Sequence, residues 1–96
     1  FYFVIKKDSI QTLHPIPGKT NKKIDAAKYH FIKENLLTIL SGSNPTHTEM
    51  MEALYTKVKD DFEGGVQWYG ETVKLDLEAR KIIERVPGKQ VRYKLK

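Results

Sequence analysis

The chain has 96 residues, no cysteine and a formal net charge of +5 at pH 7. This length fits one domain with one core, and the lack of cysteine excludes disulfides and thiolate metal sites. No apolar run approaches the roughly 20 residues of a membrane span, and Phe1–Ile5 is too short for the core of a signal peptide. We therefore expect a soluble, cytoplasmic protein.

The charge is unevenly distributed along the chain. Residues 1–28 carry six Lys against two Asp (+4), and residues 29–80 carry five basic against nine acidic groups (−4). Residues 81–96 carry six basic groups against Glu84 alone (+5). Such asymmetry creates a local field that attracts polyanions. The simpler interpretation is that the charge serves solubility, and the sequence does not decide between the two.

The N-terminal part contains two short apolar runs, Phe1–Ile5 and Ile10–Leu13. Their β-favouring residues predict a strand in the first run, or a hairpin formed by both. Residues 14–23 follow as a loop that two prolines interrupt and that lysines then make basic. We expect residues 1–23 to form an N-terminal extension of a strand and a basic loop, and residues 24–96 to form the domain.

Two helices are predicted in the middle of the chain. The first begins near Asp25, a good N-cap, and ends at about Ser41, with its apolar residues on one face. Thr46-His47-Thr48-Glu49 matches a capping box, which predicts that the second helix begins there. A start at Thr48, with residues 45–47 in a short strand, is the alternative.

The third helix is predicted from Val66 to Arg80. Gly70 inside it costs about 1 kcal/mol relative to alanine, which indicates close approach of a neighbouring helix. Asp76 is a candidate to turn inward and pair with Arg80. Four polar residues are expected to face outward, namely Gln67, Glu71, Lys74 and Glu78, with Trp68, Thr72 and Leu75 between the two faces.

The chain ends in a predicted two-stranded ribbon. Residues 82–86 and 90–96 are expected to pair around Pro87-Gly88. In the second strand apolar residues alternate with Arg92, Lys94 and Lys96, which is typical of a half-buried strand with one cationic face. The predicted fold is therefore α+β: a three-helix winged-helix domain with a C-terminal β-hairpin wing and a short N-terminal strand extension.

The residues give no indication of catalysis. His14, His30 and His47 are 16 and 17 residues apart and lie in different predicted elements, so they lack the spacing of metal ligands. No serine stands in a nucleophile-elbow context, and the carboxylates at residues 60–63 have no nucleophile beside them. We expect a protein that is not an enzyme and that holds no cofactor and no metal.

A helix followed by a cationic ribbon favours DNA binding. In helix-turn-helix domains the second helix of the motif enters the major groove, and here that helix begins at Val66. Its amide, hydroxyl and ammonium groups that could contact bases or phosphates belong to Gln67, Thr72 and Lys74. The cations of the ribbon that could contact phosphates are Arg85, Lys89, Arg92 and Lys94.

The charge of the third helix favours an alternative. This helix carries Glu71, Asp76 and Glu78 against Lys74 and Arg80, a net charge of −1, whereas a helix between phosphate rows is normally neutral or positive. The alternative function is a protein-interaction or dimerisation module without specific DNA binding. The residues expected in such an interface are Trp68, Leu75, Phe1 and Phe3.

The pattern of several segments resembles a family of small bacterial winged-helix proteins of unknown function. The shared features are the Trp68-Tyr69 pair, the helix sequence VKLDLEA at residues 73–79 and the wing sequence IERVPG at residues 83–88, and LHPIPGKT at residues 13–20 is also similar. The likeness covers roughly residues 10–96 and implies the fold. The wing is similar to that of bacterial transcription regulators, except that Lys81 stands where they usually have glycine. The leading hypothesis is a non-catalytic protein that binds double-stranded DNA as a transcriptional regulator, with a homodimer as a further possibility.

Overall fold

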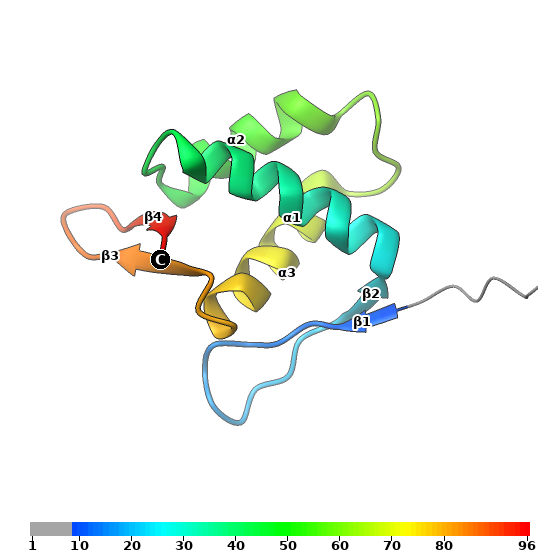
Figure 1. The fold of residues 1–96 in the computed structure, drawn as a ribbon, viewed down its shortest axis with the longest axis horizontal. Helices are drawn as coiled ribbons and strands as arrows, with labels where there is room; N and C mark the ends of the chain where they lie inside the picture. The colour runs from blue at the N-terminus through cyan, green and yellow to red at the C-terminus, as the bar shows by residue number, and fades with distance from the viewer. Residues whose placement is uncertain (1–8) are drawn as a thin grey trace, which may run out of the picture.

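The computed structural model describes residues 9–96 and combines three α-helices with two small antiparallel strand pairs (Figure 1). The α+β class expected from the sequence is therefore confirmed. The predicted strand at Phe1–Ile5 lies outside the described residues. In chain order the elements are β1 (Ser9–Gln11), β2 (Lys23–Asp25), α1 (Ala26–Ser41), α2 (His47–Val58), α3 (Val66–Ala79), β3 (Ile83–Val86) and β4 (Arg92–Leu95).

Side-chain caps fix the starts of α1 and α2. The Asp25 carboxylate accepts a hydrogen bond from the backbone N–H of Lys28 at 3.1 Å. At α2 the Thr46 hydroxyl accepts from the Glu49 N–H at 3.2 Å, and the Glu49 carboxylate accepts from the Thr46 N–H at 2.9 Å. These two reciprocal bonds form the predicted capping box. The alternative helix start at Thr48 is wrong.

The end of α3 is a left-handed cap occupied by lysine. Lys81 has φ 62°. Its N–H donates to the Glu78 carbonyl at 3.1 Å, and the Ile82 N–H donates to the Leu77 carbonyl at 2.9 Å. This pair of bonds is the Schellman arrangement, in which glycine usually takes the left-handed position because it has no Cβ. The departure noted at Lys81 in the sequence is therefore a real backbone feature.

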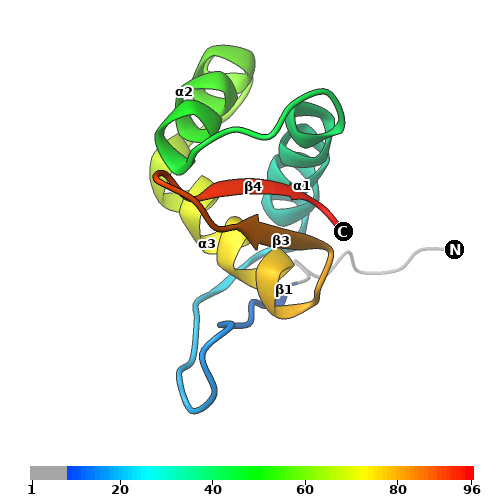
Figure 2. The same ribbon diagram turned by 90° about the vertical axis from the view of Figure 1, so that its left-hand side faces the viewer.

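One hydrophobic core joins the three helices and the C-terminal strands. Ile32 of α1, Leu54 of α2 and Leu77 of α3 are fully buried, and Ile83 and Tyr93 add the inner side of the strand pair β3–β4. Figure 2 shows this strand pair lying beside α3 and α1. The apolar spacing predicted for each helix therefore faces a single interior.

Gly70 lies at a close contact between α3 and α2. A Cβ placed on Gly70 would lie 2.7 Å from Cδ2 of Leu54 and 2.9 Å from Sδ of Met51. Both distances are shorter than an ordinary carbon contact, so no larger residue fits without movement of α2 side chains. The prediction that this glycine marks close helix packing is confirmed.

The first two strands form a hairpin attached to α3. β1 pairs with β2 in antiparallel register, with Ile10 opposite Ile24. β2 was not predicted, and the boundary expected between residues 23 and 24 runs through it. The loop between the strands, residues 12–22, is hydrogen-bonded to α3, as described below. The N-terminal extension is thus continuous with the helical part of the fold over the described residues.

Candidate nucleic-acid interface

The C-terminal ribbon, residues 83–95, divides its side chains between two faces. Because the register sets Arg85 opposite Tyr93 and Glu84 opposite Lys94, the first pair shares the face that also carries Ile83, and the second pair lies on the other face. Ile83 and Tyr93 are buried, so their face packs on the helices. The other face is directed to solvent and carries Lys94 and Arg92.

Arg85 is on the inner face and is held by α3. Its Nε donates to Oε2 of Glu78 at 3.1 Å, and its guanidinium lies 5.6 Å from the centre of the Tyr93 ring. The Glu78 carboxylate, only 7 % exposed, raises the pKa of Arg85. Since the side chain of Arg85 is 52 % exposed, it reaches solvent but remains paired.

The cations of the outer face and tip have weaker partners. Arg92 donates from Nη1 to the Asn44 carbonyl at 2.9 Å and to the Glu49 carboxylate at 3.2 Å. Lys94 lies 3.7 Å from the Glu84 carboxylate directly across the ribbon. Lys89 is exposed in the loop between the strands and forms no ion pair with a described residue. Exposed ion pairs of this kind contribute about 0–1 kcal/mol each.

Two of the residues expected to contact DNA from α3 are buried. Lys74 is 4 % exposed and Thr72 is 6 % exposed. The ribbon lies against the side of α3 that carries Lys74, and the loop of residues 12–22 lies against Thr72, whose carbonyl accepts from Nδ2 of Asn21 at 3.1 Å. The prediction that Lys74 faces outward is wrong, and in this conformation neither side chain is available to a groove.

Lys74 is enclosed by groups from α2, α3 and β4. Its Nζ lies 3.2 Å from Nδ1 of His47, 3.3 Å from the Tyr93 hydroxyl and 3.9 Å from Oε1 of Glu78. It also lies 4.6 Å from the centre of the Tyr93 ring, within cation–π range. Glu78 was predicted to face outward as well, but its side chain is 7 % exposed and balances the charge of Lys74 inside the fold.

His47 is the titratable neighbour of this lysine. It is the first residue of α2, partly buried, with Nδ1 directed at Lys74. Burial, and then the positive charge of Lys74, lower the pKa of His47 below its ordinary value. The imidazole is therefore held in its neutral form, in which Nδ1 can accept a hydrogen bond from Lys74.

The surface of α3 that remains open is small. Gln67, Trp68 and Glu71 are exposed, Trp68 to 48 %, and Leu75 is half-buried. The ring of Trp68 packs edge-to-face on Tyr69, with 4.9 Å between the ring centroids. Of the predicted base-contacting residues only Gln67 keeps an accessible side chain. Of the predicted interface residues, Trp68 is accessible, whereas Phe1 and Phe3 lie outside the described residues.

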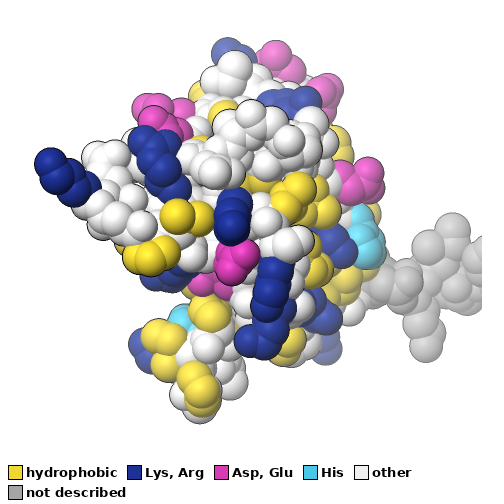
Figure 3. Space-filling model, turned by 60° about the vertical axis from the view of Figure 1, so that its left-hand side comes forward, with side chains coloured by type: hydrophobic (Ala, Val, Ile, Leu, Met, Phe, Trp, Pro, Cys, Tyr) yellow, Lys and Arg dark blue, Asp and Glu magenta, His cyan; other side chains and the backbone are white. Residues whose placement is uncertain are grey.

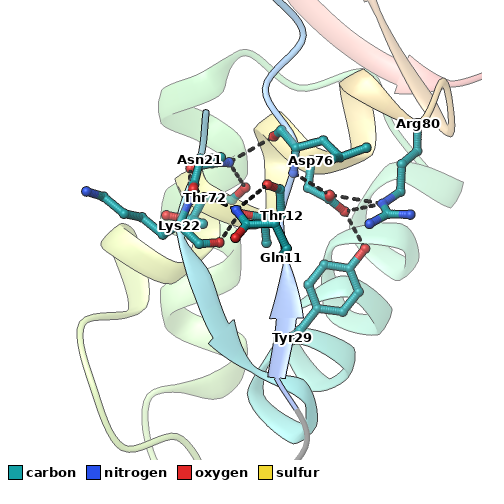
Figure 4. A network of polar contacts seen from close by, with 9 residues as sticks. Gln11, Thr12, Asn21, Lys22, Tyr29, Thr72, Asp76 and Arg80 are labelled. Carbon is teal, nitrogen blue, oxygen red and sulfur yellow. Dashed lines mark hydrogen bonds and ion pairs between the residues drawn. The ribbon is translucent and has the colours of Figure 1, made fainter. Parts of the chain in front are cut away.

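A buried carboxylate connects α3 to α1 and to the N-terminal hairpin (Figure 4). Asp76 is fully buried and accepts from the Leu13 N–H at 2.8 Å, from the Tyr29 hydroxyl, and from Nε of Arg80 at 2.9 Å to both carboxylate oxygens. Its pairing with Arg80 confirms the inward orientation considered from the sequence. Burial, and then the hydrogen bond to Asp76, raise the pKa of Tyr29 well above its ordinary range.

The extent of this architecture coincides with a protein family. A family model described as a family of unknown function (DUF6958) matches residues 9–93. The chain belongs to the DUF6958 family. The match begins at the first residue of β1 and ends within β4, so it includes the N-terminal hairpin, the three helices and most of the ribbon. Searches of curated proteins and of solved structures gave no significant match.

The described part of this DUF6958 member has neither a cluster of metal-binding side chains nor a helix that could span a membrane. Within residues 9–96, no three His, Asp or Glu side chains lie together in a way that could hold a metal ion. Over the same residues, none of the helices combines the length and the apolar character needed to cross a bilayer.

Proposed function

We propose that this DUF6958 protein is a non-catalytic winged-helix protein that binds double-stranded DNA, as a transcriptional regulator, through the outer face and tip of its C-terminal ribbon. The observation that carries the proposal is that Arg92 and Lys94 lie on the solvent-directed face of a ribbon fixed to the core by Ile83 and Tyr93. Lys89 is exposed in the loop at the tip of the same ribbon. A rigid ribbon with cations on its free face matches the row of phosphates along a duplex.

The ion pairs of the ribbon do not oppose this function. Glu49 and Glu84, the partners of Arg92 and Lys94, have side chains that are 56 % and 42 % exposed. A pair that contributes so little at the surface can be exchanged for a phosphate contact at little cost. Arg85 is different because Glu78 is buried, and we assign it a role in holding the ribbon against α3.

The accessible part of α3 supports weak sequence discrimination. Gln67 is an exposed amide that can pair with adenine in the major groove. Lys74 is the one cation within α3, and it is buried. Binding is therefore expected to depend mainly on phosphate contacts, which position a protein on DNA but carry no sequence information directly.

Titration of a fluorescently labelled duplex at several salt concentrations tests this function. Each neutralised phosphate contributes a slope of about −0.9 to the plot of log K against log salt, so three ribbon cations predict a slope of about −2.7. The double variant Lys89→Ala/Lys94→Ala removes two of them, and the slope should become shallower by about 1.8. Micromolar protein that shows no salt-sensitive binding at low salt would contradict the proposal.

A matched control distinguishes the effect of the ribbon cations on DNA binding from the effect of net charge. Lys57 and Lys59 are exposed at the end of α2 that is distant from the ribbon, since α2 begins beside Arg92 and extends for 12 residues. The variant Lys57→Ala/Lys59→Ala removes the same charge and should leave the slope near that of the parent protein. If both double variants weaken binding equally, the cations act as a diffuse field and the ribbon has no special role.

The second candidate function is a dimerisation or protein-interaction module. It is favoured by one observation: Trp68 is 48 % exposed on the open part of α3, with Leu75 half-buried on the same helix. Exposed tryptophan is enriched at interfaces. Sedimentation of the intact chain and of Trp68→Ala tests this function. A concentration-dependent dimer that the variant loses would support it, and a monomer in both would contradict it.

A further inference from the structure

The N-terminal arm, residues 9–25, consists of β1, β2 and the loop between them. In Figures 1 and 2 the loop extends away from the helices, in a different direction from the C-terminal ribbon. The sequence of this loop, LHPIPGKT at residues 13–20, has no role in the function proposed above. The arm is nevertheless a built structure, because hydrogen bonds fix both its base and its tip.

The base of the arm is fastened to α3 on both sides of the loop (Figure 4). The Leu13 N–H donates to the buried Asp76 carboxylate at 2.8 Å. Nδ2 of Asn21 donates to the Leu13 carbonyl at 3.0 Å and to the Thr72 carbonyl at 3.1 Å. The loop therefore leaves α3 in a defined direction.

The tip of the arm is a tight turn. The Lys19 N–H donates to the Ile16 carbonyl at 3.2 Å, and Gly18, the third residue of this turn, has φ 86°. Proline second and glycine third with positive φ are the residues of a type II turn. Pro15 and Pro17 on either side of Ile16 restrict the backbone further. The tip is thus preorganised, and little conformational entropy remains to be lost on binding.

The tip presents an apolar side chain beside one cation, Lys19, and two further lysines stand at the base of the arm. Ile16 is 50 % exposed. From residue 9 to residue 24 the arm carries Lys19, Lys22 and Lys23, all exposed, and no Asp or Glu. An exposed apolar residue alone is ordinary, but here it stands at the end of a rigid projection that carries a net charge of +2 over residues 9–25.

The arm and the ribbon border one hollow of about 280 Å³. Its lining includes Pro15 of the arm and Arg85 of the ribbon. Figure 3 shows a recess between the ribbon and the lower lobe of the surface, with Lys and Arg side chains along it and Asp and Glu side chains among them. The remaining lining residues are Glu78, Lys81, Ile83, Glu84 and Lys96.

We propose that the N-terminal arm is a second DNA contact, in which Ile16 enters the minor groove as an apolar wedge and Lys19 and Lys22 contact the phosphates beside it. The inference rests on the proposed function and adds the mode of binding. Isoleucine and proline are among the residues that minor-groove proteins insert between base steps, kinking the duplex by about 20–90°. Ile16 at the tip lies four residues after Thr12, which is paired with Lys22, so the loop reaches at most about 13 Å. The minor groove is about 7.5 Å deep.

The chemistry of the tip favours DNA over other partners. The surface that one half-exposed isoleucine can bury is far smaller than the total of about 1,000 Å² that a stable protein interface buries. It is also too small for membrane anchoring, which requires a long acyl chain or a whole amphipathic helix. A narrow groove lined by phosphates needs only a small apolar residue with cations beside it.

Energy transfer between dyes at the two ends of a duplex of about 30 base pairs, with an A·T-rich centre, tests the wedge. The wild-type protein should shorten the distance between the ends, and 2-aminopurine at the central step should brighten as it unstacks. Ile16→Ser should bind roughly three- to tenfold more weakly, because the lost contact is that of about one half-buried isoleucine. The variant should also lose the bend and the 2-aminopurine signal, with its salt slope unchanged.

Two controls accompany this experiment. Tyr55→Ser removes a side chain that is 57 % exposed on α2, outside both the arm and the ribbon, and should bind and bend like the wild type. Lys19→Gln/Lys22→Gln keeps Ile16 but should reduce the salt slope by about 1.8. Equal unfolding temperatures for all variants are expected because every substituted side chain is exposed.

The failure of the wedge is distinguishable from the failure of the proposed function. If the wild type binds DNA with a salt slope that depends on the ribbon, and Ile16→Ser binds and bends equally, the wedge is overturned and the proposed function stands. If the wild type shows no salt-sensitive binding, both fail. If Ile16→Ser binds and bends DNA like the wild type but sediments less with vesicles that contain phosphatidylserine, the arm contacts lipid and the inference is overturned.

Discussion

Replacing Asp76 with alanine is expected to destabilise the domain more than any exposed substitution, because this carboxylate holds three parts of the chain together. It accepts hydrogen bonds from Leu13 in the arm, Tyr29 in α1 and Arg80 at the end of α3. Asp76 and Tyr29 are 0 % and 3 % exposed, so water has little access to the bond between these two side chains. The substitution leaves a hydroxyl and a backbone N–H without their acceptor.

The magnitude follows from these three contacts. A buried donor left unsatisfied costs about 1–3 kcal/mol, which applies to the Tyr29 hydroxyl, whereas the part-buried bond from the Leu13 N–H contributes about 0.5–1.5 kcal/mol. The side chain of Arg80 is 39 % exposed, so its ion pair is largely screened and adds at most about 1 kcal/mol. The expected loss is about 3–4 kcal/mol. Domains of this size have a total stability of about 5–15 kcal/mol, so the loss is a large part of it.

Thermal and urea unfolding measure this loss. A change of 1 kcal/mol shifts the midpoint of a domain of 60–100 residues by about 4–8 °C, so Asp76→Ala should lower it by roughly 15–25 °C. Tyr29→Phe removes only the hydroxyl and should cost about 1 kcal/mol. The double variant Asp76→Ala/Tyr29→Phe should lose about 1 kcal/mol less stability than the sum of the two single variants. This difference is the coupling energy between the two side chains.

Asp61→Ala serves as the control for the loss of one carboxylate. Asp61 is exposed after α2, and its substitution should change stability by no more than about 0.5 kcal/mol. If Asp76→Ala costs less than about 1 kcal/mol, or if its effect is additive with that of Tyr29→Phe, the carboxylate is not the connection described here. Loss of the arm alone would also be visible, as faster amide exchange limited to residues 9–25.

Three further substitutions test the packing of α3 on α2, the left-handed cap of α3 and the titration of His47. Gly70→Ala should destabilise by about 1–2 kcal/mol, because the clash with Leu54 outweighs the gain in helix propensity of about 1 kcal/mol. Lys81→Gly should stabilise by about 0.5–1 kcal/mol by relieving a left-handed residue. Burial, and then the charge of Lys74, lower the pKa of His47, so as pH falls the unfolded chain takes up this proton before the folded chain does. Its contribution to stability is present above about pH 6.5 and is lost as pH falls through the folded-state pKa, and His47→Gln should flatten this part of the pH profile.

Each of these substitutions has a matched control. Gly42→Ala places a Cβ where no described atom lies within 4 Å, so it should not destabilise by overpacking. Lys81→Ala removes the charge but keeps a Cβ at positive φ, and a gain equal to that of Lys81→Gly would contradict the explanation by strain. Urea midpoints at pH 5 and pH 7 compare His47→Gln with His30→Gln, an exposed histidine on α1. If both variants change equally in their urea midpoints between pH 5 and pH 7, the contribution assigned to His47 is contradicted.

Local features of the structure could be predicted from the sequence. The capping box at Thr46, the close approach at Gly70 and the pairing of Asp76 with Arg80 each depend on residues a few positions apart or on the chemistry of one residue. Such short-range signals act within one or two helical turns. β2 was missed because Lys23-Ile24-Asp25 has a single apolar residue between two charges, and its pairing with β1 spans an 11-residue loop.

The candidate site was predicted less well because its geometry depends on distant segments. Helical spacing places Lys74 and Glu78 on one side of α3, but spacing does not reveal that the ribbon later folds over that side. Thr72 is covered in the same way by the loop that contains Asn21, 51 residues earlier in the chain. A polar stripe on a helix therefore predicts a shared face, and only the tertiary arrangement decides whether that face meets water or a charged partner inside the fold.

The burial of α3 on two sides limits what the proposed DNA-binding function can recognise. The arm covers Thr72 and Asp76, and the ribbon covers Lys74, so α3 serves mainly as the central support of both projections. Base reading then depends on Gln67, one exposed amide near the start of the helix. If DNA is bound by the ribbon and kinked by the arm, discrimination between sequences must come largely from how easily a base step bends. Flexible pyrimidine–purine steps in the central position should therefore be preferred, even where no side chain contacts a base edge.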